Sequence, residues 1–170
     1  MSADLPIQVA VTSYELSLFA HISGAIVGLG ATFVESLTYP VAMRLDPRYL
    51  PYKHRLQLAI NVFLALPALV VVLATGLYQV SEAELELGDF WLSGTMTIVI
   101  ALAAMLGAYF IPEDRRLQAM AERDIAASGS GNVSLSPEYR RRVRIEASVG
   151  TVADLLVLAA VYLMVTKPGL

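Results

Sequence analysis

The chain has 170 residues, of which 56% are hydrophobic and 16% charged, with a net charge of −3 and a mean hydropathy of +0.62. A soluble domain of this size carries far more charge, so the composition excludes an ordinary soluble protein and indicates an integral membrane protein. The absence of a basic patch with interleaved aromatic residues argues against a nucleic-acid partner. The absence of cysteine excludes disulfides, Cys-based zinc sites and Cys nucleophiles.

Four apolar stretches of the sequence are each long enough to cross a bilayer. About 20 helical residues, rising about 1.5 Å each, span a hydrocarbon layer of about 30 Å. The sequence therefore predicts an all-α fold, a transmembrane four-helix bundle in contact with the lipid bilayer, as a single domain over residues 1–170. We expect its helices at about 13–43, 55–80, 90–127 and 137–166.

Capping residues and prolines set the expected ends and bends of these helices. Thr12 and Glu15 have the spacing of a capping box, which predicts that the first helix begins beside them. Pro40 predicts a kink or stop near the end of this helix, because proline removes a backbone donor and disfavours helix in the preceding residue. Pro67 predicts a bend in the second helix and Pro112 a kink in the third.

The charges between the helices predict the topology. Seven arginines lie between the last two apolar stretches, whereas the connection 81–89 has four acids and no base. The first two helices are separated by four basic residues: Arg44, Arg48, Lys53 and Arg55. The positive-inside rule places both basic connections in the cytoplasm and both termini outside. We expect extensions of the third and fourth helices to pack against each other in the cytoplasm. His54 lies in the first basic connection, where we expect a solvated surface role.

Two acids and an amide lie within the apolar stretches. Glu35 precedes Arg44 by nine residues and Asp154 follows Arg144 by ten, so each is expected about 15 Å from the inner boundary, with Asn61 about 9 Å from it. An ionised acid at mid-bilayer costs about 3 kcal/mol or more, so we expect each acid to face the bundle interior, to stay protonated or to be paired. One interpretation is a proton or cation site formed by Glu35, Asn61 and Asp154. The alternative is a pair of neutral acids that hydrogen-bond to neighbouring helices.

A second candidate site lies on the first helix near the outer boundary. His21 is followed by Gly24 and Gly28, where a flat ligand could approach the backbone. This pattern suits haem b with His21 as axial ligand and Met96, Met164 or water opposite. Imidazole with thioethers also suits copper, as Cu(I), so His21 is a candidate metal ligand as well. The alternative is a structural histidine, with the two glycines serving helix packing.

Several short motifs carry a resemblance to a known family. They are the early histidine with G-x-x-x-G, a proline followed by Thr-Gly in the second helix, a tryptophan opening the third, and the ending YLMVTKPG. In these the chain resembles a bacterial family of predicted four-span membrane proteins of unknown function. Its distant relatives include the copper-resistance D domain and the membrane protoporphyrinogen oxidases that use haem. The resemblance implies a bacterial inner (cytoplasmic) membrane location.

The same resemblance gives His21 the position of the histidine linked to haem in the oxidases. The tryptophan and the proline-arginine pair that follow that histidine in the oxidases are missing, and this chain has Glu35 and Thr38-Tyr39-Pro40 instead. This departure argues against oxidase activity and leaves cofactor binding as an expectation.

Three functions follow from these candidates. The first is a haem-binding redox or haem-handling protein that uses His21. The second is a proton-coupled transporter or cation channel that uses Glu35, Asn61 and Asp154. The third is a non-catalytic assembly factor that pairs with a membrane protein or with a second copy of the chain. The sequence has no hydrolase triad, phosphate loop or metalloprotease motif, and it leaves open whether the protein is an enzyme.

Overall fold

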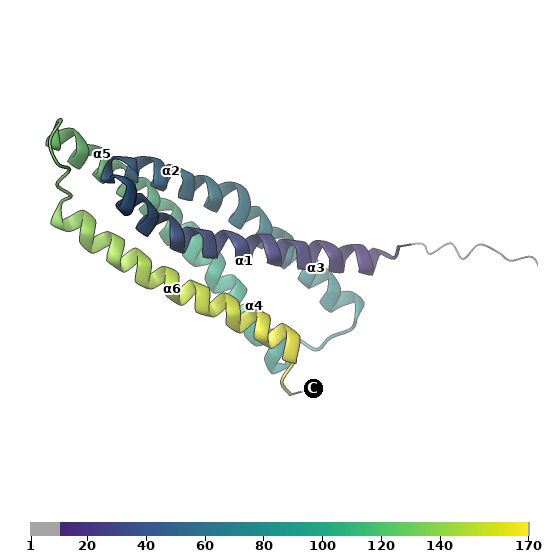
Figure 1. Ribbon diagram of the computed structural model, residues 1–170. Helices are drawn as coiled ribbons and strands as arrows, with labels where there is room; N and C mark the ends of the chain where they lie inside the picture. Colours follow the sequence, from purple (N-terminus) through teal and green to yellow (C-terminus); the bar gives the residue numbers. More distant parts are fainter. Residues whose placement is uncertain (1–10, 170) are drawn as a thin grey trace, which may run out of the picture.

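The computed structural model describes residues 11–169, which form four long antiparallel helical rods (Figure 1). All four rods are long and apolar enough to cross a membrane, which confirms the predicted transmembrane four-helix bundle. The second and third rods each consist of two α-helices joined by a π-helical turn, and a short 3₁₀ turn precedes the second. The elements in chain order are α1 (Ser13–Leu45), η1 (Pro47–Tyr49), α2 (Leu50–Ile60), η2 (Asn61–Ala65), α3 (Leu66–Glu82), α4 (Phe90–Met105), η3 (Leu106–Phe110), α5 (Ile111–Ser128) and α6 (Pro137–Thr166).

The first rod begins at the predicted capping box. The Thr12 hydroxyl accepts a hydrogen bond from the Glu15 backbone N–H at 3.1 Å, and Glu15 Oε2 accepts one from the Thr12 N–H at 2.8 Å. These two bonds satisfy amides that have no partner inside the helix. At the other end Pro40 lies inside α1 and does not stop it, since the helix continues to Leu45.

The prolines of the second and third rods each follow a π-helical turn. Pro67 lies two residues after η2 and Pro112 two residues after η3. The residue before each proline donates its N–H five residues back, from Leu66 to the Asn61 carbonyl and from Ile111 to the Leu106 carbonyl. A proline ring clashes with the carbonyl four residues before it, and the wider π turn makes room at that point. Both rods therefore continue past their prolines.

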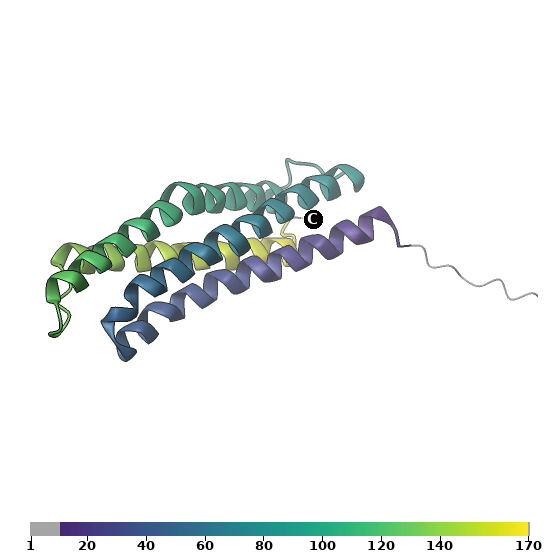
Figure 2. The ribbon, with the colours of Figure 1, turned by 90° about the horizontal axis from the view of Figure 1, so that it is seen from above.

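The four rods alternate in direction, so the α1–α2 and α5–α6 connections lie at one end of the bundle (Figures 1 and 2). The α3–α4 connection and the end of α6 lie at the other. The structure thus places the two basic connections together at one end of the bundle and the acidic connection at the other. The closest pairings are α1 with α3, α2 with α5, and α4 with α6. The two basic connections therefore share one side of the membrane.

Large apolar side chains cover the outside of the rods. Phe19, Leu37, Phe63 and Val165 are 69%, 66%, 73% and 77% exposed, and many similar residues lie around the bundle. Exposed apolar area on this scale marks contact with lipid or protein. The spans therefore contact the bilayer directly.

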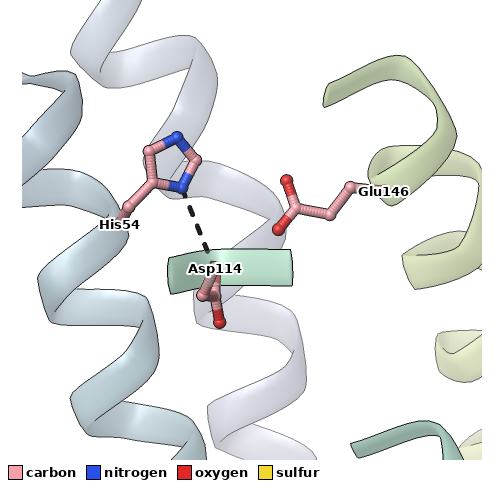
Figure 3. A group of neighbouring side chains, drawn as sticks. All are labelled: His54, Asp114 and Glu146. Atoms are coloured by element: carbon pink, nitrogen blue, oxygen red, sulfur yellow. Dashed lines mark ion pairs between the residues drawn. The ribbon is translucent and has the colours of Figure 1, made fainter. Parts of the chain in front are cut away.

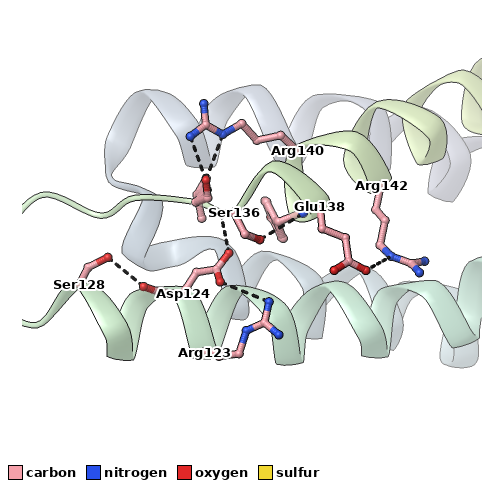
Figure 4. A network of polar contacts seen from close by, with 9 residues as sticks. Arg123, Asp124, Ser128, Ser136, Glu138, Arg140 and Arg142 are labelled. Atoms are coloured by element: carbon pink, nitrogen blue, oxygen red, sulfur yellow. Dashed lines mark hydrogen bonds and ion pairs between the residues drawn. The ribbon is translucent and has the colours of Figure 1, made fainter.

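The α5–α6 hairpin extends beyond the α1–α2 connection (Figures 1 and 2). Its two arms contact each other as expected: the Arg142 guanidinium donates to both oxygens of Glu113, at 2.9 and 3.1 Å. Near the tip, the Ser136 N–H donates to Asp124 Oδ2 at 2.8 Å (Figure 4). This end also holds an apolar core that includes Leu50, Leu117, Ala121, Leu135, Tyr139 and Val143.

Candidate intramembrane polar site

A cavity of about 370 Å³ lies between the four rods and is lined by residues of each of them. Towards the α3–α4 end its walls are apolar and include Gly24, Ala68 and Val157. The polar lining residues gather towards the α1–α2 end, where the chain enters the second rod. They are Thr32, Glu35, Ser36, Tyr39, Lys53, Gln57, Asn61, Glu146, Thr151 and Asp154.

The structure places Glu35 and Asp154 on the lining of this one cavity. Asp154 Oδ2 accepts a hydrogen bond from the Ser36 hydroxyl at 3.1 Å, which ties α6 to α1. Asp154 Oδ1 and Glu35 Oε1 are both buried and have no hydrogen-bond partner among residues 11–169. Two carboxyl groups from different rods therefore each present an unpartnered oxygen in the same region.

Asn61 also lines the cavity, but its amide is committed to another acid. Asn61 Nδ2 donates to Asp114 Oδ2 at 2.9 Å, and both residues are buried. Asn61 opens the π turn η2, and Asp114 follows η3 by four positions. The two turns thus bring the second and third rods together through one polar contact.

His54 corrects an expectation from the sequence, because it is completely buried rather than solvated. Its Nε2 lies 2.9 Å from the Tyr139 hydroxyl, and its Nδ1 lies 3.9 Å from Asp114 Oδ1. The expected solvation was wrong because α2 begins at Leu50, so His54 lies on a helix and not in a loop.

A helical pattern in the sequence indicates this buried face of α2. Leu50, His54, Gln57 and Asn61 are spaced by four, three and four residues, and all four are buried. This spacing places side chains along one side of an α-helix. The basic residues around them conceal the pattern, because charges beside an apolar span indicate topology rather than burial.

Lys53 brings a cation to the polar end of the cavity. It is 5% exposed, and its ammonium lies 5.8 Å from the centre of the Tyr39 ring. Within the described chain no carboxylate oxygen lies within 4.0 Å of that ammonium. Glu35 and Glu146 line the same cavity as Lys53. One lysine and several acids therefore share a region of low dielectric, where charge is costly unless it is compensated.

His21 lies at the interface of α1 and α3, away from this cavity. Its Nδ1 is 3.0 Å from the Thr75 hydroxyl, which itself donates to the Val71 carbonyl at 2.6 Å. A Cβ added at Gly76 would lie 3.2 Å from the His21 ring, so this glycine makes room for the imidazole.

Gly24 packs closely against α3, because a Cβ there would lie 3.1 Å from Val72 and 3.3 Å from the Ala68 carbonyl oxygen. Gly28 faces the same Ala68 with more space, at 3.7 Å. Both glycines also line the cavity. The close approach of the two helices at Gly24 is the small-residue packing common between membrane helices.

The residues predicted to hold haem are divided between two helix pairs. His21 lies against α3, whereas Met96 and Met164 are on α4 and α6, which pack against each other where Gly94 meets Leu163. None of His21, Met96 and Met164 lines the cavity. The described residues therefore do not place Met96 or Met164 opposite His21, and haem binding at His21 stays a prediction.

Four spanning rods, a lipid-facing exterior and a polar interior site define a multi-pass integral membrane protein. The chain belongs to the family described as predicted integral membrane protein (DUF2269), whose model matches residues 15–168. This match confirms the resemblance to a family of four-span proteins of unknown function. No curated protein matches the chain significantly, and neither does any solved structure.

Proposed function

We propose that the protein is a proton-coupled membrane transporter whose coupling site includes Glu35, Asp154 and Asn61. The observation that supports this most is that the unpartnered oxygens of Glu35 and Asp154 are buried on the lining of one cavity within the spanning region. Intramembrane acids mark proton relays and ion pathways because their burial is costly without a function or a partner. The proposal also places the basic connections in the cytoplasm and the protein in a bacterial inner membrane.

The cavity suits a small amphiphilic solute. Pockets that bind small molecules are typically about 300–1,000 Å³, mostly apolar, with a few convergent polar groups. Here the apolar walls near Gly24 and Val157 would contact the hydrocarbon part of the solute, and the end near Lys53 and Tyr39 would contact its polar group. A carboxyl group that is neutral in one conformation and ionised in another would couple the transport of the solute to the transfer of a proton.

One hydrogen bond beside this site crosses between the first and fourth rods. The Ser36 hydroxyl on α1 donates to Asp154 on α6, and α1 and α6 contact each other less than α1 and α3 do. A change in the protonation of Asp154 would therefore change a contact between α1 and α6 on the lining of the cavity.

Proton flux into liposomes tests this proposal. Protein reconstituted with a pH-sensitive dye inside the vesicles should conduct protons under a potassium-valinomycin potential, and Glu35→Gln and Asp154→Asn should reduce the rate to that of protein-free vesicles. Glu86→Gln is the matched control, because Glu86 is an exposed acid in the α3–α4 connection. Equal flux in all variants would exclude Glu35 and Asp154 as coupling residues.

Haem binding at His21 and a role as an assembly factor stay predictions from the sequence. A visible spectrum of protein expressed in haem-replete cells decides the first, because bound haem gives a Soret band. A pull-down in mild detergent decides the second. Neither prediction is supported by the position of His21 against Thr75.

A further inference from the structure

We propose that His54, Asp114 and Glu146 form a binding site for a divalent transition-metal cation of the Zn²⁺, Mn²⁺ or Fe²⁺ class. One ligand atom from each residue lies within 4.8 Å of the others, and the three side chains are 0%, 0% and 6% exposed. Figure 3 shows His54 and Asp114 facing each other, with Glu146 pointing towards them from α6. The three residues come from three rods, so a bound cation would join α2, α5 and α6.

Unpartnered atoms provide an independent observation for this site. His54 Nδ1, Asp114 Oδ1 and Gln57 Oε1 are buried and have no hydrogen-bond partner anywhere in residues 11–169. Buried polar atoms in folded proteins are nearly always hydrogen-bonded, so three without a partner in one cluster call for a ligand. The 3.9 Å between His54 Nδ1 and Asp114 Oδ1 is too long for a hydrogen bond.

The surrounding hydrogen bonds orient these atoms as metal ligands. The Tyr139 hydroxyl lies 2.9 Å from His54 Nε2, and an Nε2–H that donates to it leaves Nδ1 free to coordinate. Asn61 binds Asp114 Oδ2 at 2.9 Å, which leaves Oδ1 on the side of His54. Partners of this kind fix the orientation of ligands in metal sites.

The distances allow coordination after a small movement. Ligand atoms about 2.1 Å from one cation lie between about 3.0 and 4.2 Å apart, depending on the angle at the metal. The His54–Asp114 separation of 3.9 Å is already within this range. At a tetrahedral angle the ligand atoms lie about 3.4 Å apart, so the 4.8 Å limit on the other pairs requires a closure of at most about 1.4 Å.

The ligand types select the class of metal. One imidazole with carboxylate oxygens suits Zn²⁺, Mn²⁺ and Fe²⁺, and the absence of thiolate and thioether from the set disfavours Cu(I). Gln57 adds a neutral carbonyl oxygen, since its Nε2 lies 3.5 Å from Glu146 Oε1 and its Oε1 has no partner. The two carboxylates of the site form no ion pair with the single ammonium of Lys53. A bound divalent cation would neutralise both.

Metal content measured on tag-free, chelator-stripped protein in detergent tests the site. After incubation with Zn²⁺, Mn²⁺ or Co²⁺ and gel filtration, we expect one equivalent of metal to remain, and Co²⁺ to give visible d–d absorption. His54→Ala and Asp114→Asn should lose both signals. His21→Ala is the matched control and should keep them, because His21 lies against α3 and outside the cluster.

Two outcomes would overturn the proposal: wild-type protein that retains none of the three metals, or His54→Ala protein that retains as much as wild type. If His54→Ala fails to fold, Glu146→Gln serves instead, because it replaces a ligand with an isosteric amide. A rise in the melting temperature of the wild-type protein on addition of metal tests the site without any variant. An unchanged melting temperature together with unchanged metal content in Glu146→Gln would also overturn it. None of these measurements depends on proton flux or on Glu35 and Asp154.

Discussion

Asn61 Nδ2 donates a 2.9 Å hydrogen bond to Asp114 Oδ2 in the middle of the bundle, and both residues are buried. The bond joins the second rod to the third beside their two π turns. The same Asp114 presents its other oxygen to His54 at 3.9 Å. Asn61 therefore connects the lining of the cavity to the buried histidine cluster.

Asn61→Leu tests the contribution of this bond to stability. The variant leaves Asp114 Oδ2 without its amide donor, and an unsatisfied buried acceptor costs about 1–3 kcal/mol. We expect a lower midpoint of thermal unfolding in detergent, followed by circular dichroism. Gln118→Leu is the control, because Gln118 binds Glu122 on an exposed surface and its loss should change the midpoint little.

Tyr139→Phe tests whether the buried His54 depends on its hydroxyl partner. The change removes only the oxygen that lies 2.9 Å from Nε2, so we expect a loss of about 1 kcal/mol of stability. Chemical denaturation in mixed micelles measures this loss. Tyr52→Phe, at a tyrosine that is 67% exposed, should leave the unfolding curve unchanged. Equal curves for both variants would mean that the hydroxyl does not stabilise the cluster.

Gly24→Ala tests the close contact between α1 and α3. The new methyl group would lie 3.1 Å from Val72 and 3.3 Å from a backbone oxygen, and overpacking of this kind costs about 1–3 kcal/mol. Gly30→Ala is the matched control in the same helix, since nothing lies within 4 Å of a Cβ there. Alanine is favoured over glycine in helices by about 0.5–1 kcal/mol, so Gly30→Ala should raise the thermal midpoint. A higher midpoint for Gly24→Ala would contradict the packing role of Gly24.

Asp124 gives the α5–α6 hairpin a dependence on pH. Asp124 lies near the tip of the hairpin, outside the apolar spans. Burial raises the pKa of its carboxyl group, but hydrogen bonds from Ser136 and the nearby charge of Arg123 have the larger effect. Together they hold the pKa below its ordinary value. A depressed pKa in the folded state contributes stability that is present above the unfolded pKa and lost as pH falls through the folded one. We expect protease to cleave the hairpin faster as the pH falls below about 4, the ordinary range of an aspartate.

Asp124→Asn isolates this contribution. The variant keeps a side-chain oxygen for the Ser136 N–H and removes the charge, so at neutral pH it should be cleaved faster than wild type and its rate should change less with acid. Hydrogen bonds to charged groups contribute about 1.5–3 kcal/mol, which sets the scale of the neutral-pH difference. A variant with the wild-type pH profile would show that another group is responsible.

The sequence predicted the rods and part of the candidate site. Hydropathy identified four spans because lipid allows few other structures, and the Thr12 capping box follows a local rule. Depth counted from the basic residues brought Glu35 and Asp154 to one level, and the structure places both on one cavity. Whether these residues carry a function stays a prediction.

The buried cluster could not be predicted in the same way. Asp114 and Glu146 stand among arginines, and Lys53 and His54 among basic loop residues, so their charges indicated topology rather than burial. Their contacts depend on which faces of three rods meet. The residues in contact are 53 and 89 positions apart in the sequence, so only tertiary packing brings them together. The π turns that set these faces also have no local signal beyond the proline that follows each.

The turn η2 holds one more residue per revolution than an α-helix would. If the same five residues, Asn61–Ala65, were wound as an ordinary α-helix, everything downstream would be rotated by about 100°. Thr75 would then swing away from His21, and the glycine that accommodates the imidazole would face elsewhere. A single surplus amino acid in the middle of the second rod thus decides what the first rod meets at the far side of the membrane.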